Sequence, residues 1–243
     1  MKRPAKSRAV TPGVADAGDA APHYLGHRER LRDRFVAGGE AAVSDYELIE
    51  LVLFRAIPRV DVKPLAKELI RNFGGFGAAL TAADHLLLEI KGMTRAAITE
   101  FRLVHAASLR LSRAHVMKRP VISSWTALLD YVSAALANER KEQFRVLFLD
   151  RKNVLIADEV QQKGTVDHTP VYPREVVSRA LELGASAVIL VHNHPSGDPK
   201  PSREDIEMTR EIAAAAKPLR ITVHDHLIVG KGAHASFKSL GLL

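Results

Sequence analysis

Two histidines separated by one residue, His192 and His194, end an apolar run that has the character of a buried strand. Residues two apart on a strand point to the same face, so both imidazoles can meet at one point. A loop rich in proline and glycine follows, and Asp205 returns in the first turn of a helix that Ser202 opens. Two imidazoles and a carboxylate suit zinc and leave a fourth position for water. The spacing therefore predicts a catalytic metal site at His192, His194 and Asp205.

A plainer interpretation makes His192 a hydrogen-bonded core histidine and pairs Ser202 with Asp205 as a capping box. This interpretation explains the start of the helix, but it explains neither two histidines at a strand end nor the loop after them. The whole string is more specific than its parts: His-x-His-Pro, the loop to Pro201, then Ser-x-x-Asp.

This string resembles the signature of the JAMM (MPN+) metalloproteases. The residues around it resemble the bacterial RadC family from about Gly26 to Leu243. The residues that carry this second resemblance are Gly26-His27-Arg28, Tyr172-Pro173-Arg174-Glu175 and Asp225-His226-Leu227-Ile228. The JAMM resemblance implies a cytidine-deaminase-like α/β/α domain with zinc bound by His192, His194 and Asp205.

The resemblance also implies a catalytic machinery. Zinc lowers the pKa of a bound water toward ~7 and polarises a carbonyl. Ser202 is expected to donate a hydrogen bond to the developing oxyanion, although its hydroxyl can also serve only as the helix cap. JAMM enzymes take their general base from a glutamate upstream, at the start of a strand beside the metal strand. Glu142 occupies the matching place, and Glu175 and Glu159 are the other candidates.

His224 and His226 flank Asp225 and form a second polar cluster. Alternation along a strand predicts that both histidines lie on one face, where they would support the metal ligands from behind. The alternative is that both are ordinary core histidines.

The composition favours a soluble, cytoplasmic protein. The 243 residues are 47% hydrophobic, which is ample for a buried core, and include no cysteine for a disulfide framework. No apolar run approaches the ~20 residues that span a bilayer, and no signal peptide is visible. We therefore expect no membrane partner.

The positive charge is confined to the first half of the chain. Residues 1–120 hold 20 Lys or Arg against 13 Asp or Glu, a balance of +7, whereas residues 121–243 hold 15 of each. An excess of this kind predicts an anionic partner, with DNA as the candidate, or it serves general solubility. Residues 1–22 are expected to be a disordered basic tail.

The element pattern predicts two domains, a helical one over 23–118 and an α/β one over 121–243, joined near Lys118-Arg119-Pro120. In the first domain, Gly74, Gly75 and Gly77 are expected to form a turn. Helices are predicted over 27–36, 46–55, 62–73, 82–89 and 95–115. The second domain is predicted as a mixed sheet flanked by helices. Its strands are expected over 144–149, 154–160, 187–191, 221–223 and 227–229, and its helices over 124–136, 172–183 and 206–216.

The turn Ile90-Lys91-Gly92-Met93-Thr94 before a helix has the shape of a helix-hairpin-helix module, which holds a phosphate on backbone N–H groups. The second glycine of the usual hairpin is replaced by Thr94, so an ordinary helix–helix turn is the alternative.

Several functions remain to be compared. A zinc-dependent hydrolase of an amide or isopeptide bond, acting on a peptide substrate, fits the string best. A DNA-associated binding protein with a metal domain that does not hydrolyse is the second hypothesis. His192-Asn193-His194 spells HNH in one-letter code. An HNH nuclease is disfavoured because the residues of that motif are spread over a ββα element and are not adjacent. A nucleobase deaminase is disfavoured because His-x-Glu and Cys-x-x-Cys are missing.

Overall fold

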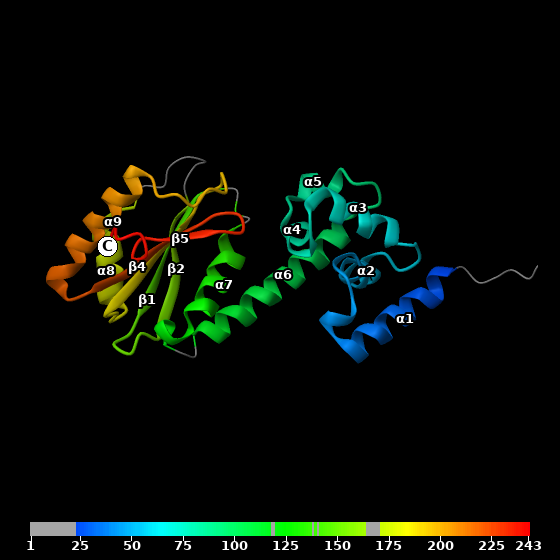
Figure 1. Cartoon of the computed structure of the whole chain (residues 1–243), viewed down its shortest axis with the longest axis horizontal. Helices are drawn as coiled ribbons and strands as arrows, with labels where there is room; N and C mark the ends of the chain where they lie inside the picture. The colour runs from blue at the N-terminus through cyan, green and yellow to red at the C-terminus, as the bar shows by residue number, and fades with distance from the viewer. Residues whose placement is uncertain (1–22, 118–119, 138, 140, 164–170) are drawn as a thin grey trace, which may run out of the picture.

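The computed structural model describes residues 23–117, 120–137, 139, 141–163 and 171–243. The predicted basic tail at 1–22 and the linker residues Lys118 and Arg119 lie outside this part of the chain. Within it, a group of helices at one end and an α/β layered unit at the other are connected by one long helix (Figure 1). No helix in the described part of the chain is long and apolar enough to cross a membrane.

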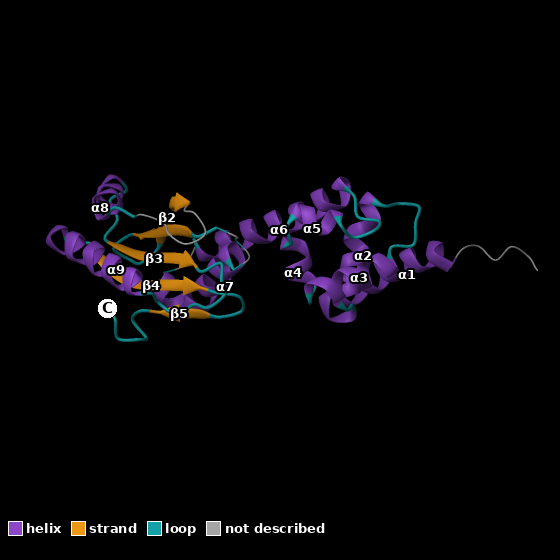
Figure 2. Cartoon of the chain, turned by 90° about the horizontal axis from the view of Figure 1, so that it is seen from above, coloured by secondary structure: helices purple, strands orange, loops and turns teal. Residues whose placement is uncertain are grey.

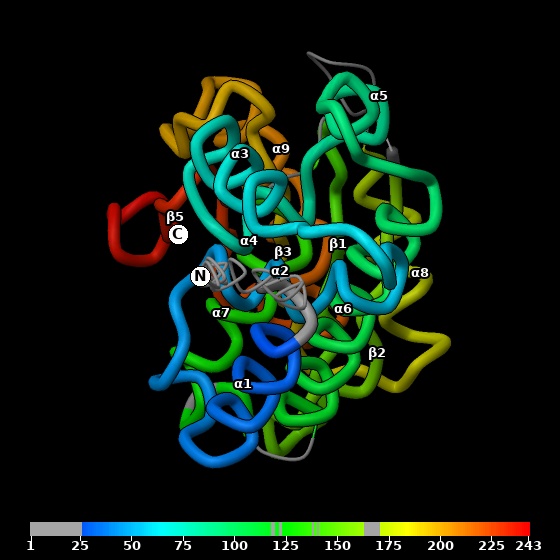
Figure 3. Tube along the Cα trace, turned by 90° about the vertical axis from the view of Figure 1, so that its right-hand side faces the viewer, coloured from blue at the N-terminus to red at the C-terminus, as the bar shows by residue number. Residues whose placement is uncertain are grey.

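The helical unit is built from amphipathic helices that bury one face each around a common apolar core. Ser44 begins α2 with a reciprocal capping box to Glu47. Figure 3, viewed along the long axis, shows these helices in front of the sheet. They are α1 (His23–Gly38), the 3-10 turn η1 (Glu40–Ala42), α2 (Asp45–Ala56), α3 (Lys63–Phe73), α4 (Phe76–Thr81), α5 (Asp84–Leu88) and α6 (Arg95–Val116).

The predicted turn at Gly74, Gly75 and Gly77 is wrong at its last residue. Gly74 ends α3 with a φ of 90°, as a left-handed C-cap does, but Gly77 lies inside α4. The amide of Phe76, in the first turn of α4, donates to the Asp45 carboxylate of α2, which satisfies one of the free N–H groups of a helix start. A contact from a distant helix therefore stabilises a short helix that the local sequence disfavours.

The second unit is a mixed sheet between helices, as predicted. Its strands in the described residues follow the order β2-β1-β3-β4-β5, with β3 and β4 parallel and the other neighbours antiparallel (Figure 2). Helix α7 covers one face, and α8 and α9 cover the other. The elements are η2 (Val121–Ser124), α7 (Trp125–Leu136), β1 (Gln143–Leu149), β2 (Leu155–Lys163), α8 (Pro173–Glu182), β3 (Ala187–Asn193), α9 (Arg203–Ala216), η3 (Lys217–Leu219), β4 (Thr222–Val229) and β5 (His234–Ser236).

The two short strands predicted over 221–223 and 227–229 are one continuous strand, β4. Of the polar residues between the two predicted strands, Asp225 and His226 are buried within β4, and both have hydrogen-bond partners. The Asp225 carboxylate accepts from the amides of His226 and Lys238 and from the Ser236 hydroxyl. A buried polar group with its hydrogen bonds made does not interrupt a strand.

Helix α6 contributes to the cores of both units. Its first turns bury Ala97, Ile98 and Phe101 among the helices, whereas Val116 in its last turn packs with the α7 face of the sheet. The two cores are thus tied together by a continuous helix that ends just before the predicted linker.

Truncation of Val116 should therefore weaken the α/β unit rather than the helical unit. We expect Val116→Ala to lower the free energy of unfolding by about 1–3 kcal/mol, because the side chain is fully buried. Leu111→Ala on the same helix is the control, since Leu111 is 74% exposed. Denaturant unfolding followed by Trp125 fluorescence measures both, and equal effects of the two changes would contradict this assignment.

Candidate metal centre

Three donor atoms converge where β3 ends and α9 begins. The Nε2 atoms of His192 and His194 lie 3.0 Å apart; Oδ1 of Asp205 lies 3.2 Å from the first, and Oδ2 of Asp205 lies 3.4 Å from the second. Ligands on a tetrahedral zinc, at bond lengths of about 2.0–2.1 Å, lie ~3.3 Å from one another. The predicted ligands therefore come together with a spacing that fits a metal ion.

Asp205 is prepared to carry a negative charge. It occupies the third position of α9, where the helix dipole favours an anion, and its Oδ2 accepts from the amide and hydroxyl of Ser202. Burial alone would raise the pKa of Asp205, but hydrogen bonds from His192 and His194, which donate when their rings are protonated at Nε2, and from Ser202 hold that pKa far below its ordinary value. The carboxylate is therefore ionised and available to a cation.

His194 presents its Nε2 lone pair to the same point. Its Nδ1 lies 2.8 Å from the carbonyl oxygen of Asp198, which can only accept, so Nδ1 carries the proton of the neutral ring. The hydrogen bond with Asp205 raises the pKa of His194, against the opposing effect of burial. A proton and a metal ion therefore compete for this position, which makes metal binding stronger as the pH rises.

His192 is oriented by a buried chain of hydrogen bonds behind it. Thr209 donates its hydroxyl proton to the Asp205 carbonyl at 2.6 Å, so Thr209 can only accept from Nδ1 of His226, also at 2.6 Å. The His226 Nε2 then accepts from His192 Nδ1 at 2.8 Å, which leaves the Nε2 lone pair of His192 facing the ligand cluster. Every hydrogen bond in this chain therefore donates away from the ligand cluster, and this is the arrangement that a metal-bound His192 requires.

Only one histidine of the predicted second cluster supports the site. Burial lowers the pKa of His226, as its role as a neutral link requires. His224 instead bonds Asn153 at 2.6 Å. The pairing of β3 with β4 shifts between Val188 and Ile189 and passes over His224, so simple alternation does not hold there.

The loop between the two ligand segments is fixed against the turn after β4. The His194 amide donates to the Val229 carbonyl at 3.0 Å, and the Lys231 amide donates to the Gly197 carbonyl at 3.2 Å. A Cβ atom on Gly230 would lie 2.2 Å from the Gly197 oxygen. The two backbones thus approach at a distance that only glycine permits, which explains a glycine that sequence analysis did not single out.

The structure separates the three candidate bases. Glu142 acts electrostatically on His194, where its charge helps to raise the pKa of the imidazole. Both oxygens of Glu159 are held by Arg179 of α8, at 2.9 and 2.7 Å. Glu175 is exposed in the first turn of α8 and lies 4.0 Å from Arg174. Of the three, Glu142 is the carboxylate that contributes to the raised pKa of His194, after the larger effect of Asp205.

Ser202 lies beside the ligands, and its hydroxyl proton is directed to Asp205. Its oxygen also accepts the Asp205 amide at 3.0 Å, which completes the capping box. In this arrangement Ser202 orients a ligand; donation to an oxyanion requires its hydroxyl to turn away from Asp205.

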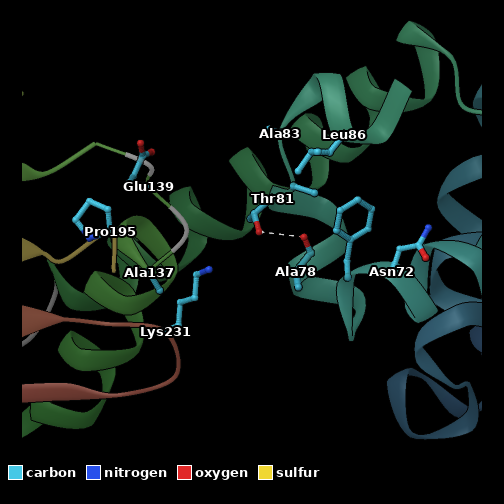
Figure 4. Close-up of a pocket in the computed structure, with 11 residues that line it drawn as sticks. Asn72, Ala78, Thr81, Ala83, Leu86, Ala137, Glu139, Pro195 and Lys231 are labelled. Carbon is cyan, nitrogen blue, oxygen red and sulfur yellow. Dashed lines mark hydrogen bonds between the residues drawn. The ribbon is translucent and has the colours of Figure 1, made fainter. Parts of the chain in front are cut away.

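A hollow of about 330 Å³ adjoins the loop after His194 (Figure 4). Pro195 and Lys231 line it from the α/β unit, and Phe73, Ala78 and Leu86 line it from the helical unit. Side chains of both units thus face the same space, and Pro195, the residue that follows His194 in the chain, is the part of its lining nearest in sequence to the candidate ligands.

Comparison with known proteins agrees with this geometry. The model of the RadC-like JAB domain matches residues 122–242, which contain the sheet and the ligand cluster. A UPF0758 protein of Ruegeria pomeroyi is 60% identical over 223 residues, which are 91% of this chain and 100% of that protein. The α/β unit is thus a JAB-type domain. The chain belongs to the RadC family, as the sequence resemblance predicted.

The buried chain behind His192 should strengthen metal binding. We expect His226→Ala to lower the affinity for Zn²⁺ by about 10–100-fold, the usual effect of losing a partner of a metal-bound histidine. Thr209→Val should have a smaller effect in the same direction, because it removes the acceptor for His226.

His224→Ala is the matched control, since His224 lies on the same strand but contacts Asn153. Competitive titration with a fluorescent chelator measures all three variants. Equal losses for His224→Ala and His226→Ala would show that the effect comes from general damage to β4.

Proposed function

We propose that this chain is a zinc-dependent hydrolase that cleaves an amide or isopeptide bond in a peptide substrate. The observation that carries the proposal is the convergence of His192, His194 and Asp205 within 3.0–3.4 Å, with each lone pair directed to one point. Two imidazoles with one carboxylate leave a coordination position for water, as in catalytic rather than structural zinc sites.

A bound zinc ion would supply a Lewis acid that activates water at neutral pH. The chain's own residues supply the rest. Glu142 takes the proton of the attacking water and passes it to the leaving nitrogen. The contribution of its charge to the raised pKa of His194, the ligand with a partly exposed side chain, supports this role, whereas Glu159 is held by Arg179. Ser202 holds Asp205 and donates to the oxyanion when its hydroxyl turns.

The hollow beside Pro195 supports a peptide substrate. Its wall from the helical unit includes the apolar side chains of Phe73 and Leu86, and its other wall contains Lys231 and Glu139. A chain that carries an apolar residue next to the cleaved bond fits this combination. In this proposal the helical unit takes part in substrate binding.

The test compares Glu142→Gln with His194→Ala. Glu142→Gln keeps the shape of the side chain and removes its basic oxygen, so zinc content should stay at the wild-type level while hydrolysis falls by about 10²–10⁴-fold. His194→Ala should lose both zinc and hydrolysis, because it removes a ligand.

Zinc content is measured by mass spectrometry of the metal, and hydrolysis by mass spectrometry of a library of peptides and isopeptide-linked peptides. Loss of zinc in Glu142→Gln would make Glu142 a ligand. Undiminished hydrolysis in Glu142→Gln would remove it from the chemistry.

The charge distribution supports a second candidate function, contact with DNA phosphates through the helical unit. The excess of +7 over residues 1–120 is the observation that favours it. The turn before α6 has Gly92 at a φ of 97° and an exposed Lys91, but Thr94 accepts the Ala97 amide and so occupies one N–H group of the helix start. Contact through Lys91 is therefore a better candidate than contact through that amide.

Duplex DNA binding by the whole chain should weaken steeply with salt if this second function holds. Lys91→Ala should make the slope of log K against log salt shallower by about 0.9, the contribution of one phosphate contact. Lys200→Ala, an exposed lysine of the α/β unit, should leave the slope unchanged. A slope near zero for the wild type would end the DNA hypothesis.

A further inference from the structure

Asn193 lies between the two metal-binding histidines but serves the opposite face of the strand. Alternation along β3 directs it away from His192 and His194, and it is 1% exposed. A buried amide needs partners for its oxygen and for both of its N–H groups.

The amide of Asn193 finds these partners in the residues that lead into β1. Its Oδ1 accepts from the backbone N–H of Gln143 at 2.9 Å. Its Nδ2 donates to the backbone carbonyls of Glu139 and Lys141, each at 3.2 Å. The opposite amide orientation would set Oδ1 against two carbonyls, so the pattern of donors and acceptors fixes the orientation.

These hydrogen bonds lie on both sides of Glu142 in the chain. The Lys141 carbonyl and the Gln143 N–H belong to the two peptide groups on either side of the Glu142 Cα atom. Holding both peptide planes fixes the backbone φ and ψ of Glu142, and with them the direction of its Cβ. The Asn193 side chain thus sets the direction in which the Glu142 side chain leaves the backbone.

The register of the sheet connects this constraint to the ligands. Phe144 pairs with His192 in the antiparallel ladder of β1 and β3. Continued by two residues, the same register sets Glu142 opposite His194, and residues directly opposite on antiparallel strands point to one face. The β1–β3 pairing does not extend past Phe144 and His192, and Asn193 supplies the contacts beyond it.

We propose that Asn193 is a positioning residue that holds the Glu142 carboxylate in register with His194 through the two peptide groups of Glu142. This inference rests on the proposed role of Glu142 as general base. It assigns a function to the middle residue of the His-x-His motif, which contributes no ligand.

The test uses the whole chain loaded with Co²⁺, whose visible absorption responds to pH through groups near the metal. Five proteins are compared: wild type, Glu142→Gln, Asn193→Leu, Asn193→Asp and the double variant that combines Glu142→Gln with Asn193→Leu. Asn193→Leu keeps the branch of the side chain at Cγ and removes all three hydrogen bonds. Asn193→Asp keeps the acceptor for Gln143 and removes the donors to Glu139 and Lys141.

Three results are expected if Asn193 acts on Glu142. Each Asn193 variant binds one Co²⁺ per chain, as the wild type does. The midpoint of the cobalt pH titration moves in the same direction as in Glu142→Gln, and Asn193→Leu adds no further shift when combined with Glu142→Gln. Hydrogen exchange at the Gln143 amide accelerates by about tenfold in Asn193→Leu, as the loss of one hydrogen bond permits, and less in Asn193→Asp.

Other results separate the two proposals. If Glu142→Gln shifts the midpoint but neither Asn193 variant does, Glu142 keeps its role and the positioning role is wrong. If Glu142→Gln leaves the midpoint unchanged, the role of Glu142 and the positioning role fail together. If both Asn193 variants lose Co²⁺, Asn193 holds the ligand strand rather than Glu142, and the proposal is overturned.

Discussion

Mutual repulsion among three lone-pair donors is the constraint around which the α/β unit is built. Two imidazole nitrogens and a carboxylate meet within 3.4 Å, and in their neutral and ionised forms they repel one another unless a cation lies between them. Without a metal, protons on the histidines can take this place, which is why the pKa of His194 is raised. The surrounding structure holds the donors together against that repulsion through contacts on every side. These are the Ser202 cap, the Asp198 carbonyl and the chain through His226 to Thr209.

Two backbone carbonyls at the ends of these hydrogen-bond chains decide which ring nitrogen of each histidine carries the proton. A backbone carbonyl cannot donate a hydrogen bond, so the carbonyl oxygen of Asp198 fixes the tautomer of His194. In the same way, the backbone carbonyl oxygen of Asp205 fixes the tautomer of His192, through Thr209 and His226. Asp205 therefore serves the site twice: its carboxylate is one of the three candidate metal ligands, and its backbone carbonyl is the last hydrogen-bond acceptor of the chain behind His192. Main-chain atoms, which substitution cannot remove, determine the chemical form of both histidines.

The sequence predicted that His192, His194 and Asp205 come together because local rules place them. Strand alternation sets His192 beside His194, and the Ser-x-x-Asp capping pattern sets Asp205 at the third position of a helix. The role of His226 could be stated only as one of two alternatives, since its contact with Thr209 depends on how α9 packs on β4. The hydrogen bonds of Asn193 could not be predicted, because its partners lie 50 or more residues away. The continuity of β4 and the helix at Gly77 were missed for the same reason, since distant contacts satisfy their polar groups.

The close approach of Gly230 to Gly197 has a consequence for how this fold tolerates sequence change. Two glycines near the same turn are required for different reasons. Gly232 has a φ of 72° with nothing within 4 Å of its Cβ position, so asparagine, which accepts left-handed torsions, is admissible there. At Gly230 the obstacle is a backbone oxygen, and no choice of side chain avoids it. A survey of natural or selected variants would therefore find substitutions at 232 but an unchanged glycine at 230, and the second pattern would reflect contact between two loops rather than local torsion.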